Sequence, residues 1–288
     1  MTDAPPRAMR HVELPGGERV PVLGQGTYRM GADPSAKRRE IAALRSGIDL
    51  GMRVIDTAEM YADGGAERIV GEAIVGRRDD VFVITKVYPW NATRELMRKA
   101  CERSLRRLRT DRIDLYLLHW RGEVPLRETV DAFHELIAAG KIRHAGVSNF
   151  DVDDLEELAR LDGGLEGIVA DQVMYNLEHR GIERDLIGWC RKRKRAVIAY
   201  SPVEEGLLTT ANHVALAAVA ERHGATAAQV ALAWVVREPG VIAIPKAAKA
   251  AHARENAAAA DLRLTKRDLA ELDASFSPPE EKVPLATR

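Results

Sequence analysis

Three short apolar runs in the first half of the chain each end in a residue that could take part in proton transfer. Val54–Asp56, Val81–Lys86 and Ile113–His119 end in an aspartate, a lysine and a histidine, and Tyr61 follows shortly after the first run. Taken singly, each of these residues has an ordinary alternative as a strand-end, surface or loop side chain. Their recurrence at the ends of consecutive runs favours a shared site.

A tyrosine beside a lysine and an aspartate is suited to donating a proton. A free phenol, with a pKa of about 10, is a weak acid at neutral pH. We expect the ammonium of Lys86 to lower the pKa of Tyr61, and Asp56 to hold that lysine charged. His119 could donate a hydrogen bond that orients and polarises a carbonyl. These groups suit carbonyl reduction by hydride transfer, because the alkoxide that forms must be protonated.

The elements that must position these residues alternate along the chain. Eight β-branched runs are each followed by a polar or Gly/Pro break and a helical pattern, which predicts βα units and a parallel sheet. The expected strands are Val22–Thr27, Val54–Asp56, Val81–Lys86, Ile113–His119, His144–Ser148, Val169–Tyr175, Ala196–Ser201 and Val241–Pro245. The expected helices are Lys37–Leu50, Ala66–Val75, Thr93–Leu108, Leu126–Ala139, Val152–Leu161, Ile182–Lys194, His213–Val236 in two pieces, and His252–Ala260.

Eight such units favour a closed (β/α)8 TIM barrel over an open doubly wound sheet. The open sheet would carry GxGxxG after its first strand, but residues 24–29 supply only the first two glycines. His11–Leu14 and Glu18–Val20 predict an N-terminal β-hairpin over one barrel end. Leu264–Asp273 predicts an extra C-terminal helix, followed by a polar tail. We expect residues 1–288 to form one domain, with the active site where the strands end.

The composition narrows the class of protein. Lys+Arg and Asp+Glu both total 43, so no overall positive field would attract nucleic acid or an anionic membrane. The basic run 191–195 ends a predicted helix, where cations favour the helix dipole, and we assign it no function. Cys101 and Cys190 lack CxxC spacing and fit a reducing compartment. With no signal-peptide pattern and no long apolar stretch, we expect a cytoplasmic protein, and we expect a monomer.

The sequence resembles the aldo-keto reductase superfamily through several motifs along nearly the whole chain. The resemblance implies a TIM barrel in which Tyr61 is the proton donor, Asp56, Lys86 and His119 complete a tetrad, and NAD(P)H binds across the barrel mouth. The stretches 172–183 and 244–248 look like a bacterial branch that includes methylglyoxal reductases. The motifs are Asp56-Thr57-Ala58-Glu59-Met60-Tyr61, Lys86, Leu118-His119-Trp120, Gly146-Val147-Ser148-Asn149-Phe150, Gln172-Val173-Met174-Tyr175-Asn176 and Ile244-Pro245-Lys246.

The same resemblance implies a set of cofactor contacts. Amide and hydroxyl groups suit the nicotinamide carboxamide, which both donates and accepts hydrogen bonds. At the adenosine end, His252 stands where the family often has an arginine, so the 2′-phosphate loses a bidentate partner unless Lys249 compensates. We therefore expect NADPH, with NADH also possible. The implied contacts are Ser148, Asn149 and Gln172 with the carboxamide, Tyr200 before Ser201 stacking on the ring, Gly26 and Thr27 near strand one, and Lys246, His252, Glu255 and Asn256 near the adenosine.

The substrate pocket is expected to be open and aromatic. Only residues 121–125 separate Trp120 from the next predicted helix, a shorter loop than in many members of the family. Tyr28, Tyr88, Trp90 and Trp120 could line the pocket, although each also has a reasonable packing role. We expect reduction of small aldehydes, ketones or dicarbonyls similar to methylglyoxal.

Two other functions stay open at this point. One is a cofactor-binding regulatory barrel resembling potassium-channel β subunits, which keep the tetrad. The other is a metal-dependent barrel hydrolase, but the predicted strand ends lack the His/Asp/Glu cluster that such a metal needs, so we expect no metal.

Overall fold

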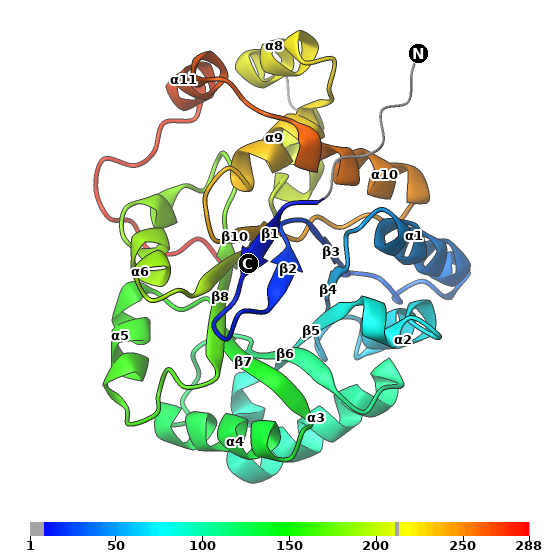
Figure 1. Ribbon diagram of the computed structural model, residues 1–288, viewed down its shortest axis with the longest axis vertical. Helices are drawn as coiled ribbons and strands as arrows, with labels where there is room; N and C mark the ends of the chain where they lie inside the picture. Colours follow the sequence, from blue (N-terminus) through cyan, green and yellow to red (C-terminus); the bar gives the residue numbers. More distant parts are fainter. Residues whose placement is uncertain (1–8, 211–212, 288) are drawn as a thin grey trace.

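The computed structural model describes residues 9–210 and 213–287. Its main sheet has eight parallel strands, each hydrogen-bonded to its neighbours in chain order, and helices surround it (Figure 1). The expected (β/α)8 barrel with an N-terminal hairpin is confirmed. The barrel strands are β3 (Gly24–Gly26), β4 (Val54–Asp56), β5 (Phe82–Val87), β6 (Ile113–Leu118), β7 (Ile142–Ser148), β8 (Ile168–Met174), β9 (Ala196–Tyr200) and β10 (Val241–Ala243), and the hairpin strands are β1 (His11–Glu13) and β2 (Arg19–Pro21).

The first and last barrel strands meet and close the sheet. The amide of Ala243 donates to the carbonyl of Val22 at 2.9 Å, and the amide of Gly26 donates to the carbonyl of Pro245 at 3.0 Å. A Cβ atom on Gly26 would lie 2.7 Å from the carbonyl oxygen of Ile244, so only glycine allows this approach. Closure thereby brings Lys246 beside the end of β3.

The helices begin within a few residues of the expected positions, and three of them start with a capping box at Asp151, Thr226 or Thr265. Two details differ from expectation. The expected helix from Ile182 begins only at Leu186, because Asp185 has non-helical backbone angles, and the short helix α7 was not predicted. The helices are α1 (Lys37–Asp49), α2 (Gly65–Ala73), α3 (Arg94–Leu108), α4 (Leu126–Ala138), α5 (Val152–Arg160), α6 (Leu186–Lys192), α7 (Leu207–Thr210), α8 (Val214–Arg222), α9 (Ala227–Val235), α10 (Ala250–Ala258) and α11 (Lys266–Ser275).

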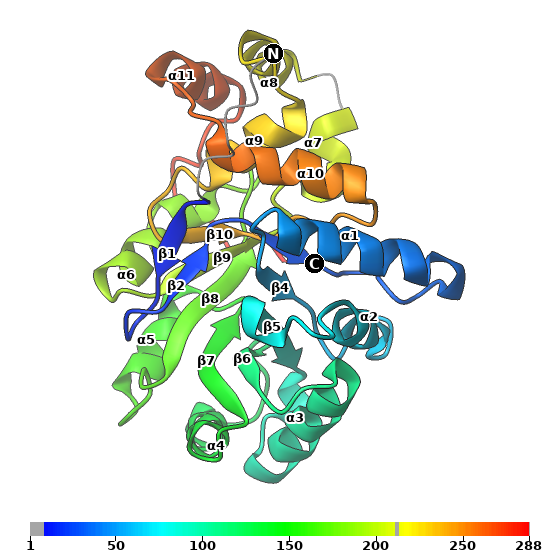
Figure 2. The ribbon, with the colours of Figure 1, turned by 45° about the vertical axis from the view of Figure 1, so that its right-hand side comes forward.

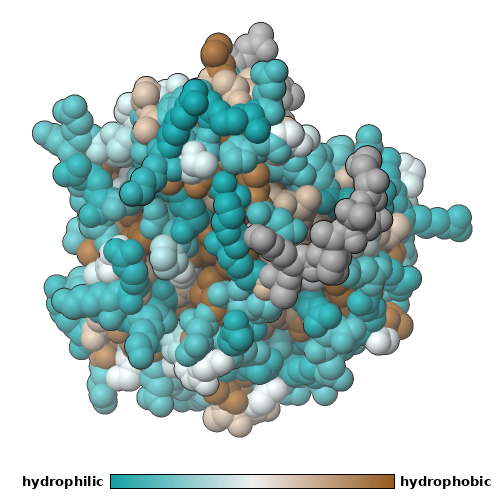
Figure 3. All heavy atoms as spheres, turned by 45° about the horizontal axis from the view of Figure 1, so that its top comes forward, coloured by the Kyte–Doolittle hydropathy of each residue, from teal (hydrophilic) through white to brown (hydrophobic). Residues whose placement is uncertain are grey.

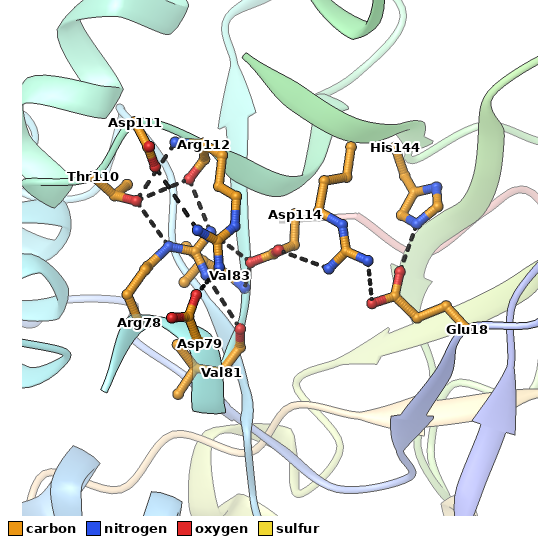
Figure 4. Close-up of polar contacts among 11 residues, drawn as sticks. Glu18, Arg78, Asp79, Val81, Val83, Thr110, Asp111, Arg112, Asp114 and His144 are labelled. Carbon is orange, nitrogen blue, oxygen red and sulfur yellow. Dashed lines mark hydrogen bonds and ion pairs between the residues drawn. The ribbon is translucent and has the colours of Figure 1, made fainter. Parts of the chain in front are cut away.

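The hairpin covers the N-terminal end of the barrel, opposite the strand ends that carry the candidate site (Figure 1). Glu18 accepts from His144 at 2.7 Å and pairs with Arg143 at 2.9 Å, both at the start of β7 (Figure 4). Arg143 also pairs with the buried Asp114 of β6, which Arg78 contacts at 2.7 Å. A continuous ionic network therefore joins the hairpin to the barrel.

The C-terminal part packs back onto the barrel. Helix α11 lies beside α8, away from the strands (Figure 2). The expected polar tail then crosses the molecule, and the Lys282 ammonium pairs with Asp151 at 3.1 Å and Asp185 at 3.3 Å. Val283 packs against Gly181, and both residues line a cavity of about 260 Å³. The tail is thus tied to the ends of α5 and α6 that face the C-terminal side of the barrel.

The surface is mostly polar on the face shown in Figure 3, where apolar side chains occupy small separate areas. Within residues 9–210 and 213–287, no helix combines the length and the apolar character needed to span a membrane. The basic run 191–195 ends α6, as expected, and Arg193 pairs there with Glu156 at 2.8 Å.

Candidate active site

A buried lysine connects two of the other residues singled out by sequence, Asp56 and Tyr61. Lys86, near the end of β5, is fully buried, and its Nζ donates to both oxygens of Asp56, at 2.8 and 2.9 Å. It also donates to the carbonyl of Thr57 at 2.8 Å and lies 3.3 Å from the hydroxyl of Tyr61. An ammonium group has three N–H donors. The contacts with Asp56, Thr57 and Tyr61 use all three N–H donors of Lys86.

Burial and pairing act in opposite directions on this lysine and aspartate. Burial lowers the pKa of Lys86, and the charge of Asp56 opposes that shift. Burial raises the pKa of Asp56, while Lys86 and a 2.7 Å hydrogen bond from Gln172 Nε2 oppose it. Each partner therefore favours the charged form of the other.

The pKa of Tyr61 was expected to fall, and that expectation is wrong. Burial raises the pKa of Tyr61 well above its ordinary value, and the charge of Asp56 and the nearby Tyr28 add to the shift. The reason is that desolvation of a phenolate outweighs the attraction of Lys86, whose charge Asp56 largely balances. At neutral pH the Tyr61 side chain is therefore a protonated phenol, which is the form that can donate.

His119 stands next to this phenol at the end of β6, with ring centroids 5.9 Å apart. Burial and the charge of Lys86 lower the pKa of His119 to about 3, so the imidazole is neutral near pH 7. Its Nδ1 atom has no hydrogen-bond partner among the residues that the structure describes. A neutral imidazole still has one N–H with which to donate.

The residues expected at the nicotinamide form one hydrogen-bonded chain. Tyr200 donates its hydroxyl proton to Asn149 Oδ1 at 2.9 Å. Asn149 Nδ2 donates to the Ser148 hydroxyl at 3.2 Å and to the carbonyl of His119 at 3.1 Å. Ser148 donates to the carbonyl of Gln172 at 2.8 Å. Since the Gln172 side chain also reaches Asp56, the chain runs from Tyr200 to the buried ion pair.

The residues expected near strand one have structural partners. Thr27 is fully buried, and its hydroxyl donates to the carbonyl of Asp56 at 2.9 Å, which ties β3 to β4. Gly26 lies beside Lys246 through the closing bridge. Ser201 follows Tyr200 with a φ of 48°, a strained backbone angle that is common at functional sites.

The residues expected at the adenosine lie on and before α10. Lys246 is exposed after β10, and His252 is exposed in the first turn of α10. Glu255 and Asn256 follow His252 at helical spacings that place them on the same side of the helix. The carboxylate of Glu255 already accepts from Thr226 at 2.7 Å, so it is only partly available to another group.

The four aromatic residues expected at the pocket lie in two places: Tyr28 packs against the phenol, and Trp120 next to the imidazole joins Tyr88 and Trp90. The ring of Tyr28 lies 5.3 Å from that of Tyr61. Tyr88 stacks on Trp90 at 4.3 Å, and Trp120 lies 6.0 Å from Tyr88. Trp90 is 59% exposed, so this aromatic wall is open to solvent.

Two carboxylates behind the site were not predicted. Glu59 accepts from the backbone amide of Tyr88 at 3.0 Å and from Asn91 at 3.2 Å, which fixes the start of the aromatic wall. Glu67 is fully buried and accepts from Thr85, next to the lysine, at 2.7 Å. Glu59 lies between Asp56 and Tyr61 in a motif noted in the sequence, so its closeness to the site could have been predicted from that motif.

No group of three or more potential metal ligands occurs in the described part of the chain. The polar groups at the mouth are a phenol, an ammonium paired with one carboxylate, an imidazole, a hydroxyl and amides. This set suits proton transfer and hydrogen bonding to a carbonyl more than metal chemistry.

Comparisons with known proteins agree with this geometry. Methylglyoxal reductase YeaE of Escherichia coli is 50% identical over 280 residues, covering 95% of this chain and 97% of the relative. Glyoxal reductase of Bacillus subtilis is 34% identical, with 91% of each chain covered. A solved aldo/keto reductase from Klebsiella pneumoniae, in complex with NADP and acetate, matches with a TM-score of 0.93 at 48% identity, covering 97% of this chain and all of the other. The family model described as Aldo/keto reductase family matches residues 22–276, and this chain belongs to that family.

Proposed function

We propose that the protein is an NADPH-dependent reductase of small aldehydes, ketones or dicarbonyls such as methylglyoxal, and that Tyr61 is its general acid. The observation that carries this proposal is the 3.3 Å contact between the Tyr61 hydroxyl and a buried ammonium that Asp56 holds from the other side. The relatives named methylglyoxal reductase and glyoxal reductase support the substrate class.

In this proposal the four residues divide the work of one proton transfer. Tyr61 gives its phenolic proton to the carbonyl oxygen as the carbon is reduced, and the phenolate left behind is stabilised by Lys86. Asp56 keeps that lysine charged and in place. Neutral His119 donates its remaining N–H to the same oxygen, so that the carbonyl carbon faces the hydride donor.

The mouth of the barrel fits a nicotinamide cofactor, which when bound supplies the hydride. An ionised carboxylate only accepts hydrogen bonds, so the amide NH2 of Gln172 must face Asp56. Its amide oxygen is then left to accept from a carboxamide, while Ser148 and Asn149 supply further polar contacts. Tyr200, whose hydroxyl is tied to Asn149, presents its ring for stacking.

The preference for NADPH depends on the adenosine end. Lys246 and Lys249 are exposed cations there, and Lys249 is the N-cap residue of α10, where the helix dipole favours a phosphate. His252 cannot form the planar fork of an arginine. We therefore propose NADPH as the preferred cofactor and use of NADH at lower efficiency.

The proposal is tested by following NADPH and NADH oxidation with a panel of small carbonyls. We expect methylglyoxal-dependent oxidation in the wild type and a loss of about 10²–10⁴-fold in Tyr61→Phe. Tyr116→Phe is the matched control, since it removes a buried phenolic hydroxyl that has no hydrogen-bond partner among the described residues, and the ring of Tyr116 packs on Phe133 of α4. No carbonyl-dependent oxidation, or equal rates in both variants, would refute the proposal. Tight NADPH binding without turnover would instead favour a regulatory barrel.

We also propose a cytoplasmic monomer. Both cysteines are free and buried, which suits a reducing compartment. Light scattering after gel filtration tests the oligomeric state, and a mass above that of one chain refutes it.

A further inference from the structure

Helices α2 and α3 lie side by side on the outside of the barrel (Figure 2). Five arginines on or next to these helices gather there. They line a hollow of about 350 Å³, here called the arginine hollow. One of them is on α2, and the others are on α3 or at its C-cap. The five are Arg68, Arg103, Arg106, Arg107 and Arg109.

Two of these arginines are held in place by buried carboxylates. Arg107 pairs with Glu67, which is fully buried. A second nitrogen of the same guanidinium group lies 3.9 Å from a carboxylate oxygen of Glu59. Arg103 pairs with the same Glu59 at 3.4 Å. These contacts fix both guanidinium groups without a flexible surface partner, so less entropy is lost when they bind a ligand.

The other three arginines have little compensation. Arg109 shares Glu72 with the Lys37 ammonium. Within the described residues Arg68 donates to the backbone carbonyl of Asp63 at 3.4 Å and has no ion pair, and Arg106 has none either. Across the hollow, five guanidinium groups and one ammonium thus share three carboxylates. Positive charge is in excess at this place although the whole chain is neutral.

The acidic residues that follow along α3 and its loop are engaged elsewhere. Glu102 pairs with Arg98 at 2.7 Å, and Asp111 lies 3.8 Å from Arg112. Both carboxylates border the adjoining hollow, together with Lys141, Arg106 and Arg109. The excess of positive charge is therefore concentrated in the arginine hollow itself.

We propose that the arginine hollow binds an oligophosphate group. Guanidinium forks match phosphate oxygens in bidentate geometry, and several of them around one concave site favour a ligand with several adjacent negative charges. The cations surround a local hollow and do not form a long stripe, which fits a small anion better than a nucleic acid strand. The site lies on the outside of the helices, so it is separate from the cofactor phosphates expected at α10.

Calorimetric titration of the NADPH-saturated protein with inorganic pyrophosphate, at low ionic strength, tests this proposal. Saturation with NADPH keeps the probe away from the cofactor site. We expect one saturable site, with inorganic phosphate binding more weakly because it carries fewer charges. ATP should bind as pyrophosphate does or more tightly, and ATP binding without pyrophosphate binding would overturn an oligophosphate site.

The test variant is Arg68→Gln with Arg106→Gln, since neither residue pairs with a carboxylate that would be left buried. The matched control is Arg160→Gln with Arg191→Gln, which removes the same charge from exposed positions on α5 and α6. We expect the affinity for pyrophosphate to fall at least about tenfold in the first variant and to stay unchanged in the control. No saturable binding in the wild type, or equal affinities in both variants, would overturn the proposal.

Discussion

Replacing Lys86 by methionine separates the ionic role of this residue from its packing role. The change keeps an unbranched side chain but removes every donor that Lys86 Nζ directs at Asp56, Thr57 and Tyr61. Asp56 is 2% exposed and would keep only the hydrogen bond from Gln172. Removing one partner of a buried pair costs about 3–5 kcal/mol, which for a chain of 288 residues lowers the melting temperature by roughly 5–8 °C.

Adding Asp56→Asn to Lys86→Met should restore much of that stability. The asparagine carries no charge, and its amide oxygen can still accept from Gln172, so the penalty for an unpaired buried charge disappears. Turnover should stay at least about 10²-fold below the wild type in both variants, because no ammonium stabilises the developing phenolate of Tyr61. If Lys86 acts through its charge, the double variant is therefore more stable than Lys86→Met but no more active.

Urea unfolding and initial rates with NADPH and methylglyoxal measure the two effects side by side. A Lys86→Met protein within about 1 kcal/mol of the wild type would refute the account of a buried ion pair. A double variant less stable than the single one would refute it as well. If activity returned together with stability, Lys86 would serve the fold and not the proton transfer.

Three further predictions concern separate parts of the molecule. Because the pKa of His119 is lowered to about 3, the pH profile of kcat should show no histidine ionisation between about pH 5 and 8; an inflection near 6.5 that disappears in His119→Gln would contradict this. Asp114→Ala should cost about 3–5 kcal/mol in urea unfolding, since two arginines lose a buried partner, whereas Glu18→Gln at the partly exposed end should cost about 1 kcal/mol or less. The reverse order would show that the hairpin contact dominates. His252→Arg should increase the ratio of NADPH to NADH efficiency about tenfold, and an unchanged ratio would place the 2′-phosphate elsewhere.

The barrel could be predicted from the sequence because its signal is local. Each strand is a short buried run, and Asp56, Lys86 and His119 stand at the ends of such runs, where the fold alone brings them to one mouth. The direction of the Tyr61 pKa could not be predicted in this way, because it depends on how completely the hydroxyl is desolvated. That property belongs to the packed structure.

Contacts between distant segments were also beyond the sequence. Gln172 was assigned to the cofactor from the family resemblance, and nothing in its neighbourhood along the chain indicates the hydrogen bond to Asp56. The tail looked like a polar extension, since the pairing of Lys282 with Asp151 and Asp185 requires the helices to be in place first. Such pairs are set by tertiary packing, which no local pattern encodes.

The enclosure of Lys86 has a consequence for the chemical durability of the protein. Dicarbonyls such as methylglyoxal are electrophiles that form adducts with amines and guanidines, and an amine attacks only with a free lone pair. Lys86 is fully buried, and its ammonium protons are committed to Asp56, Thr57 and Tyr61. An enzyme that handles such substrates would therefore keep its one essential amine out of their reach. Glycation would occur first on exposed cations such as Arg106, which lies outside the active site, so its modification would not stop catalysis.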